Sequence, residues 1–198
     1  MAEAAGLVLA AGAGRRFGGP KLALSFAGST VIGSVVAALR EAGVAPIVVV
    51  IGPHSVDVAA ALAGLDTVIA VNEDPDRGMV SSIQAGLRAL PESAPSFLVA
   101  LGDQPRLRSE DIGRLLSAHR ESGKTIALPT HAGKRGHPVL FDARCRAEIL
   151  ALGDEGTLRD VVHAHPDDLV EVELPSDAVI RDIDTQEDYQ DELRRAGE

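Results

Sequence analysis

The sequence predicts an α/β fold, namely a single three-layer α/β/α domain over residues 1–198 built on a mostly parallel, Rossmann-like sheet. Two observations predict it. Short runs of Val, Ile and Leu recur without polar alternation, and segments with helical spacing separate them. Strands that are apolar throughout are buried on both faces, so helices must cover both sides of the sheet. No repeat, low-complexity linker or clear domain boundary interrupts the pattern.

The first part of the chain alternates strand and helix. Runs of aliphatic residues bounded by Gly, Pro, Asn or Asp predict strands at 6–11, 46–51, 67–71 and 96–101. Apolar residues at helical spacing predict helices at 30–42, 55–62, 80–90 and 109–120. Thr30 and Ser109 stand where the N-caps of two of these helices are expected.

The pattern changes after residue 124. Strands are expected at 125–129, 137–141, 169–174 and 179–183, and helices at 144–150 and 156–164. An acidic helix closes the chain from Thr185. Asp184 is interpreted as its N-cap, with Glu187 completing a capping box.

Composition excludes several classes of function. The 198 residues are 45% hydrophobic, which suffices for one α/β core. The net charge of −10 argues against non-specific nucleic-acid binding and against anionic membranes, although a local basic loop could still bind an anionic substrate. A single cysteine, Cys145, suits a reducing compartment, and no apolar run approaches the ~20 residues of a membrane span. We therefore expect a cytoplasmic location.

The stretch Leu-Val-Leu-Ala-Ala-Gly-Ala-Gly-Arg-Arg-Phe-Gly-Gly-Pro-Lys, residues 7–21, predicts a phosphate-binding loop after a buried strand. Its glycines can bare backbone N–H groups to an anion, and Lys21 is one of three lysines in the chain. Phe17 stands where a dinucleotide fingerprint needs its third glycine, which weakens a dehydrogenase interpretation. Leu22 follows the lysine, so the stretch is not a Walker loop either.

Three aspartates are candidate metal ligands. Asp103 follows an apolar strand in Leu-Gly-Asp-Gln-Pro, at the edge where open parallel sheets bind ligands, although a turn or capping role competes with this assignment. Asp182 and Asp184 lie two residues apart and face one side if the segment is extended. Because capping competes for Asp184, Asp182 is favoured as the second ligand of an Mg²⁺ ion.

Six motifs occur in the order typical of MobA-like nucleotidyltransferases, and together they span Leu7 to about Tyr189. They are the glycine loop, Gly-Met-Val-Ser-Ser-Ile-Gln-Ala-Gly-Leu, Gly-Asp-Gln-Pro, Lys-Arg-Gly-His-Pro-Val-Leu-Phe, Gly-Asp-Glu-Gly and Asp-Ile-Asp-Thr-Gln-Glu-Asp-Tyr. The sequence most resembles the branch that contains molybdenum cofactor cytidylyltransferases. This resemblance implies a fold of the nucleotide-diphospho-sugar transferase type. It also implies Mg²⁺-dependent transfer of a nucleotide from an NTP to a phosphorylated acceptor, with molybdopterin as one candidate, and release of pyrophosphate.

The resemblance also implies roles for individual residues. Catalytic roles fall on Arg15, Lys21 and Asp103; nucleotide binding on Leu9, Ala10, Ala11, Gly12, Gly14, Asn72, Gly78 and Ser82; acceptor binding on Arg135 and His137; and metal binding on Asp103 and Asp182. The motif Leu-Ala-Ala-Gly favours CTP, since guanylyl members tend to read Leu-Ala-Gly-Gly. Turn and capping roles remain open for Asn72 and Ser82, as does a backbone hydrogen bond for His137.

One motif departs from the branch. Cofactor cytidylyltransferases usually read Gly-Asp-x-Gly-Ala-Arg near the acceptor, whereas this chain reads Gly-Asp-Glu-Gly-Thr-Leu-Arg. On a helix the displacement to Arg159 turns the side chain by about 100°. Two other classes of function stay open: an oxidoreductase that binds a nicotinamide nucleotide through the same loop, and a non-catalytic nucleotide-binding module.

Overall fold

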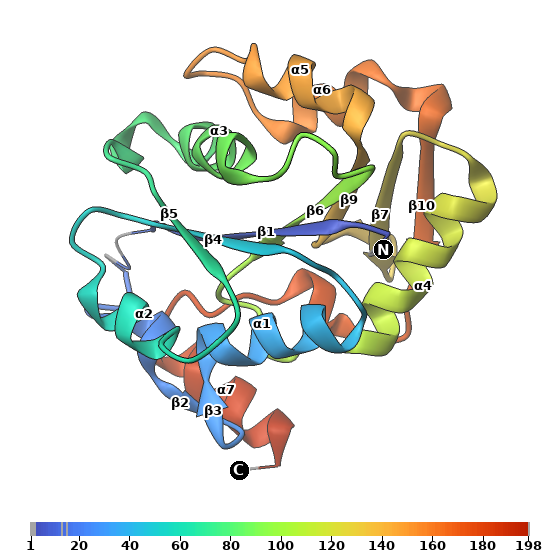
Figure 1. Cartoon of the computed structure of the whole chain (residues 1–198). Helices are drawn as coiled ribbons and strands as arrows, with labels where there is room; N and C mark the ends of the chain where they lie inside the picture. The colour runs from blue at the N-terminus through green and yellow to red at the C-terminus, as the bar shows by residue number, and fades with distance from the viewer. Residues whose placement is uncertain (1–2, 13, 15, 198) are drawn as a thin grey trace.

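A computed structural model describes residues 3–12, 14 and 16–197 (Figure 1). Its strands are β1 Ala5–Ala10, β2 Ser25–Phe26, β3 Ser29–Thr30, β4 Ile47–Ile51, β5 Val68–Val71, β6 Ser96–Leu101, β7 Ile126–His131, β8 Lys134–Arg135, β9 Val139–Asp142 and β10 Leu169–Glu173. Its α-helices are α1 Val31–Glu41, α2 Val56–Ala61, α3 Met79–Ala89, α4 Ser109–Ser122, α5 Arg146–Leu150, α6 Leu158–Ala164 and α7 Gln186–Ala196. None of the described helices is long and apolar enough to cross a membrane.

The main sheet has the strand order β10-β7-β9-β6-β1-β4-β5, with β8 paired to β7. It is mostly parallel, as predicted, and β9 runs antiparallel to both of its neighbours. The chain moves from β1 outward to β4 and β5 and then returns to the other side of β1 with β6. Parallel sheets bind ligands at such a reversal, beyond the carboxyl ends of the strands.

Two apolar cores lie on opposite faces of the sheet, which confirms the three layers. Val8 packs into the core that α1 and α4 cover, while its neighbour Leu7 packs into the core of α3 and α5. Figure 1 shows α3, α5 and α6 above the sheet and α1, α2 and α7 below it. Gly86 lets α3 approach closely, because an added Cβ would lie 2.0 Å from Leu7 Cδ1.

Most of the expected elements are present, and one strand prediction is wrong. The strand expected at 179–183 is absent, and the 3-10 helix Asp177–Ile180 occupies part of that segment. Its backbone groups bond to loops instead of to a strand: Val179 O accepts from His137 N at 2.8 Å, and Ile183 N donates to Asp103 O at 3.0 Å. The apolar residues of this segment are therefore buried because the segment packs against these loops, and not because it belongs to the sheet.

Of the caps predicted at Thr30 and Ser109, the structure has the first and not the second. Thr30 caps α1 as expected, since its Oγ1 accepts from Gly33 N at 3.1 Å. At α4 the N-cap is Arg108, with no side-chain capping bond, so Ser109 is the first helical residue instead of the cap. The short hairpin of β2 and β3 has no counterpart in the sequence-based prediction.

Candidate active site

A cavity of about 400 Å³ lies at the carboxyl ends of β1 and β6. Its walls come from segments far apart in the sequence, namely the glycine loop, the start of α3, the end of β6 and the segment before α7. The lining residues are Leu9, Ala10, Ala11, Gly12, Gly14, Arg16, Lys21, Leu22, Pro75, Met79, Ser82, Leu101, Asp103, Asp182 and Asp184. The structure thus brings together most of the residues predicted from the sequence.

The glycine loop forms one wall of this cavity. Gly14 has a φ of +56°, and an added Cβ would lie 2.7 Å from Gly19 O, so only glycine fits there. Its carbonyl accepts from the N–H groups of Phe17 and Gly18, both at 3.0 Å, which closes a tight turn. Arg15, predicted to be catalytic, lies outside the described residues.

Lys21 enters the cavity from the far end of the loop, and its side chain is 13% exposed. Its ammonium donates to Asp103 Oδ2 at 2.7 Å and to Ile183 O, and it lies 3.6 Å from Asp184 Oδ1. The lysine therefore joins the loop to two other parts of the site. It neutralises part of the charge of the carboxylates around it.

The three aspartates Asp103, Asp182 and Asp184 form an acidic site, with one carboxylate oxygen from each within 4.8 Å of the others. Burial raises the pKa of Asp182, and the charges of Asp103 and Asp184 raise it further. Mutual repulsion of this kind is relieved by a bound cation. Oxygen ligands from carboxylates are the donors that Mg²⁺ and Mn²⁺ prefer, so the residues present fit such an ion.

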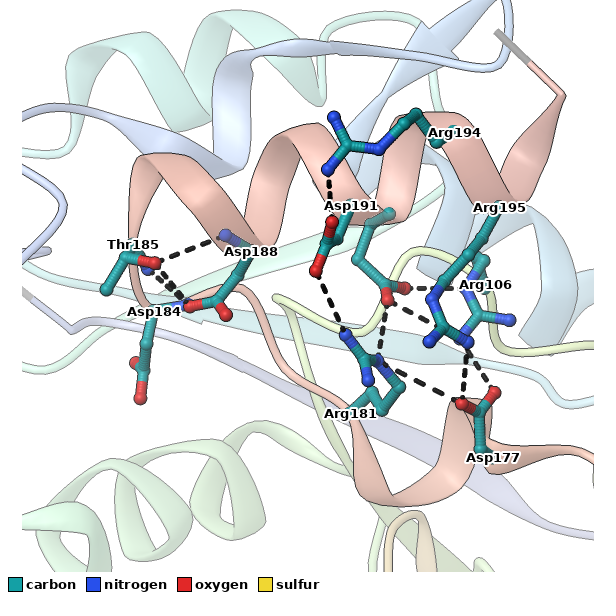
Figure 2. Close-up of polar contacts among 10 residues, drawn as sticks. Arg106, Asp177, Arg181, Asp184, Thr185, Asp188, Asp191, Arg194 and Arg195 are labelled. Carbon is teal, nitrogen blue, oxygen red and sulfur yellow. Dashed lines mark hydrogen bonds and ion pairs between the residues drawn. The ribbon is translucent and has the colours of Figure 1, made fainter.

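Asp184 can take part in the acidic site because it is not the N-cap of α7. The sequence-based interpretation placed the cap one residue too early. The N-cap of α7 is Thr185, which forms a capping box with Asp188, and not Asp184 with Glu187 (Figure 2). The backbone N–H of Asp184 donates to Asp188 Oδ2 at 3.1 Å, so its own carboxylate is left to face Lys21 and Arg16. The sequence Asp-Thr-Gln-Glu-Asp allows either register, and the structure has the one capped by Thr185.

Asn72, Gly78 and Ser82 link β5 to α3. The buried Asn72 amide donates to Ser81 Oγ at 2.8 Å and to Ser82 Oγ at 2.9 Å. Gly78 is the N-cap of α3 with a φ of +97°, a conformation that favours glycine. Ser82 lines the cavity, while Asn72 supports it from behind. The start of α3 borders the cavity through Met79 and Ser82, and helix N-termini favour anions.

The two predicted acceptor residues do not line the cavity. Arg135, on β8, is exposed and paired with Glu171, its Nε donating at 2.7 Å. Burial lowers the pKa of His137, although the charge of Asp103 opposes this shift. His137 N bonds to Val179 O, so the backbone hydrogen bond that competed with an acceptor role is present.

A second cavity of about 520 Å³ adjoins the first and shares Ala11, Gly12, Gly14, Lys21, Leu22 and Pro75 with it. The loops after β4 and β5 supply much of its remaining wall, including Gly52, Pro53, His54, Ser55, Glu73 and Asp74. The sequence predicted that these two loops lie at the ligand-binding edge of the sheet, but it gave none of these six residues a role of its own. Their position directly after two predicted strands was the available signal.

The mostly parallel sheet, with a cavity at its reversal point, is the nucleotide-diphospho-sugar transferase fold, which the chain shares with solved nucleotidyltransferases. The family model of the MobA-like NTP transferase domain matches residues 6–169. The chain belongs to this family, as its motifs indicated.

Individual relatives differ in what they are named for. Over 191 residues the chain is 34% identical to nicotine blue oxidoreductase of Paenarthrobacter nicotinovorans, with 92% of each chain covered. Among solved structures it resembles Rv0371c from Mycobacterium tuberculosis H37Rv, with a TM-score of 0.85, 28% identity and 96% of both chains covered. A nucleotidyl transferase from Methanothermobacter thermautotroptrophicus gives a TM-score of 0.83 at 26% identity, covering 97% of this chain and 96% of its own. Rv0371c has also been solved in complex with manganese.

Proposed function

We propose that this protein transfers a nucleoside monophosphate, CMP from CTP being favoured, to a phosphorylated small-molecule acceptor and releases pyrophosphate. The observation that carries the proposal is that Lys21, Asp103, Asp182 and Asp184 meet beside the glycine loop at the strand ends. Such chemistry needs no protein nucleophile. It needs positioning and neutralisation of charge, which these groups supply.

We propose one orientation for the nucleotide in the cavity. The strand end and loop at Leu9, Ala10, Ala11 and Gly12 would contact the base, and Leu-Ala-Ala-Gly is the motif that favours CTP. Backbone N–H groups around Gly14, together with the start of α3 at Gly78 and Ser82, would bind the triphosphate. Arg15 and Lys21 would neutralise the departing pyrophosphate.

The proposed cofactor is Mg²⁺, held by Asp103 and Asp182 with Asp184 as a third ligand. Its support is the all-carboxylate donor set and the manganese complex of Rv0371c. When bound, the ion neutralises triphosphate oxygens and aligns the α-phosphorus. In this chain the three carboxylates would hold the ion, and the ammonium of Lys21 supplies a further positive charge beside them.

The acceptor would enter from the side of β8 and β9. An acceptor phosphate oxygen attacks the α-phosphorus of the NTP, a new P–O bond forms, and the bond to pyrophosphate breaks. Arg135 and His137 are the proposed contacts for that phosphate. Arg135 would have to leave its ion pair with Glu171 to bind it. Molybdopterin is the acceptor that the branch suggests. Arg159, displaced from the branch motif, is exposed on α6.

A turnover assay tests the proposal. The protein is incubated with Mg²⁺, each of the four labelled NTPs and a panel of phosphorylated acceptors that includes molybdopterin, and pyrophosphate release is measured. We expect release with CTP above the other three, dependent on both metal and acceptor. No release with any NTP across the panel would contradict the proposal.

A second candidate is an oxidoreductase that uses a nicotinamide nucleotide, and the 34% identity to nicotine blue oxidoreductase favours it specifically. The same glycine loop would bind the nucleotide diphosphate. Titration with NADH and NADPH, followed by fluorescence, separates the candidates. Tight binding of either one together with no binding of any NTP would reverse the ranking. A non-catalytic nucleotide-binding module would be favoured if the three aspartates lay too far apart to share one ion. Their carboxylate oxygens lie within 4.8 Å of one another, which argues against that candidate.

A further inference from the structure

A buried carboxylate on α7 contacts neither cavity, yet it bonds to the two segments that carry the metal-ligand candidates. Glu192 is 1% exposed. Its Oε2 accepts from Arg106 Nε at 2.6 Å, and its Oε1 accepts from Arg181 Nε at 2.9 Å. Figure 2 shows the guanidiniums of Arg106 and Arg181 beside α7.

The two arginines are close in sequence to the aspartates. Arg106 lies three residues after Asp103, and Arg181 directly precedes Asp182. Each arginine therefore fixes the backbone from which one side of the acidic site projects. The segments also touch directly, since Ile183 N donates to Asp103 O at 3.0 Å.

Asp177 completes a cluster that we name the α7 clamp, formed by Arg106, Arg181, Arg195, Asp177 and Glu192. Asp177 accepts from Arg106 Nη2 at 2.8 Å and from Arg195 Nη1 at 3.0 Å. A buried carboxylate is tolerated only when it is paired and hydrogen-bonded, and Glu192 meets both conditions. A residue used only to attach α7 could be apolar, whereas a carboxylate holds two arginines at a fixed separation.

We propose that Glu192 is a positioning residue that sets the separation between Asp103 and the pair Asp182 and Asp184 through Arg106 and Arg181. This inference rests on the proposed function, because it concerns the metal ligands of that site. Glu192 itself touches neither substrate nor metal. Groups that hydrogen-bond directly to metal ligands typically change metal affinity by 10–100-fold when they are removed, and Glu192 acts one step further out, through the two arginines.

The test compares Glu192→Gln with Glu187→Gln, a matched change at an exposed position of the same helix. Mn²⁺ binding is measured by electron paramagnetic resonance and calorimetry, and melting is followed by circular dichroism. We expect Glu192→Gln to bind Mn²⁺ about 10–100-fold more weakly and to need more Mg²⁺ for turnover. Glu187→Gln should match the parent. A folded Glu192→Gln with parental Mn²⁺ affinity would overturn the inference.

A second variant decides the matter if Glu192→Gln does not fold. Arg181→Gln leaves Arg106 to neutralise Glu192 while it frees the segment that carries Asp182. We expect Mn²⁺ affinity to fall at least about tenfold, and unchanged affinity would refute the positioning role.

Parent protein and Asp103→Asn separate this inference from the proposed function. If the parent binds no Mn²⁺, or if Asp103→Asn binds it as tightly as the parent, the metal site and the inference both fail. If the parent binds Mn²⁺ through Asp103 and both clamp variants bind it equally well, only the role of Glu192 fails.

Discussion

The segment from Arg181 to Asp184 takes part in two clusters of charge that differ in balance. In the α7 clamp, three guanidiniums face the two carboxylates of Asp177 and Glu192. In the acidic site, three carboxylates face the ammonium of Lys21, and the exposed Arg16 lies 2.9 Å from Asp184. The clamp is satisfied by its own residues, whereas the acidic site has an excess of negative charge that a cation would balance.

The pKa shifts in the two clusters have opposite signs. At Asp177 burial favours the protonated form, but the bonds and charges of Arg106, Arg195 and Arg181 outweigh it and lower the pKa below 3.8. At Asp182 burial and the neighbouring carboxylates both raise the pKa above 3.8. Natural proteins tend to keep such unrelieved charge where function requires it. This contrast supports the acidic site as the functional one.

The largest effect is expected from Asp103→Asn. This change removes a proposed metal ligand and the partner of Lys21 while it preserves side-chain volume. Turnover should fall by about 10³-fold or more, because preorganised charge at the reacting phosphates is lost. Pyrophosphate release measures turnover, and circular dichroism checks the fold. Parental turnover would show that Asp103 holds no metal.

Lys21→Ala should slow transfer by about 10²–10³-fold, since one preorganised cation is lost. The same change should tighten Mn²⁺ binding in the absence of nucleotide, because the ammonium no longer competes for Asp103 and Asp184. Melting with and without Mn²⁺ measures this second effect. Weaker Mn²⁺ binding would mean that Lys21 organises the carboxylates instead of competing with a metal.

The pair Asp177→Asn and Asp182→Asn tests the contrast in stability. Because the folded pKa of Asp177 is lowered, its contribution is present above about pH 3.8 and is lost as the pH falls through the folded pKa. Asp177→Asn should therefore lower the melting temperature at pH 7, by about 2–4 °C if the contribution is ~1 kcal/mol.

The folded pKa of Asp182 is raised, so its contribution is present below about pH 3.8 and is lost as the pH rises through the folded pKa. At pH 7 the ionised group costs stability, and Asp182→Asn should raise the melting temperature of the metal-free protein. Shifts of the same sign in the two variants would refute the contrast.

The smallest effect concerns His137, whose pKa burial lowers from 6.5 despite the nearby charge of Asp103. As the pH falls, His137 therefore binds a proton at a higher pH in the unfolded chain than in the folded one. Stability should decrease as the pH falls below about 6.5, until the folded pKa is reached. Melting temperatures of the parent and of His137→Gln between pH 7.5 and pH 5 measure this loss. If the melting temperature falls equally with pH in both proteins, the pH dependence comes from another group. His119 is one example, because burial lowers its pKa as well.

The sequence by itself determined the layers and most of the site. Apolar strands, helical spacing and the glycine loop are local patterns, and parallel strands bring their carboxyl ends to one edge. That is why the residue pattern alone could group Lys21, Asp103 and Asp182, although they are far apart in the chain. The family motifs added the nucleotidyltransferase class.

Tertiary structure decided what depends on packing between distant segments. Sequence spacing allowed Asp184 to cap α7, but the docked helix begins one residue later and leaves that carboxylate in the acidic site. The apolar segment at 179–183 resembled a strand, yet its backbone bonds to the loops that carry His137 and Asp103. In the sequence Glu192 is one of several acids in an acidic helix, and only its burial against Arg106 and Arg181 indicates a role. The contacts of Asp184 with Lys21, of this segment with His137 and Asp103, and of Glu192 with Arg106 join distant parts of the chain, and no local pattern encodes them.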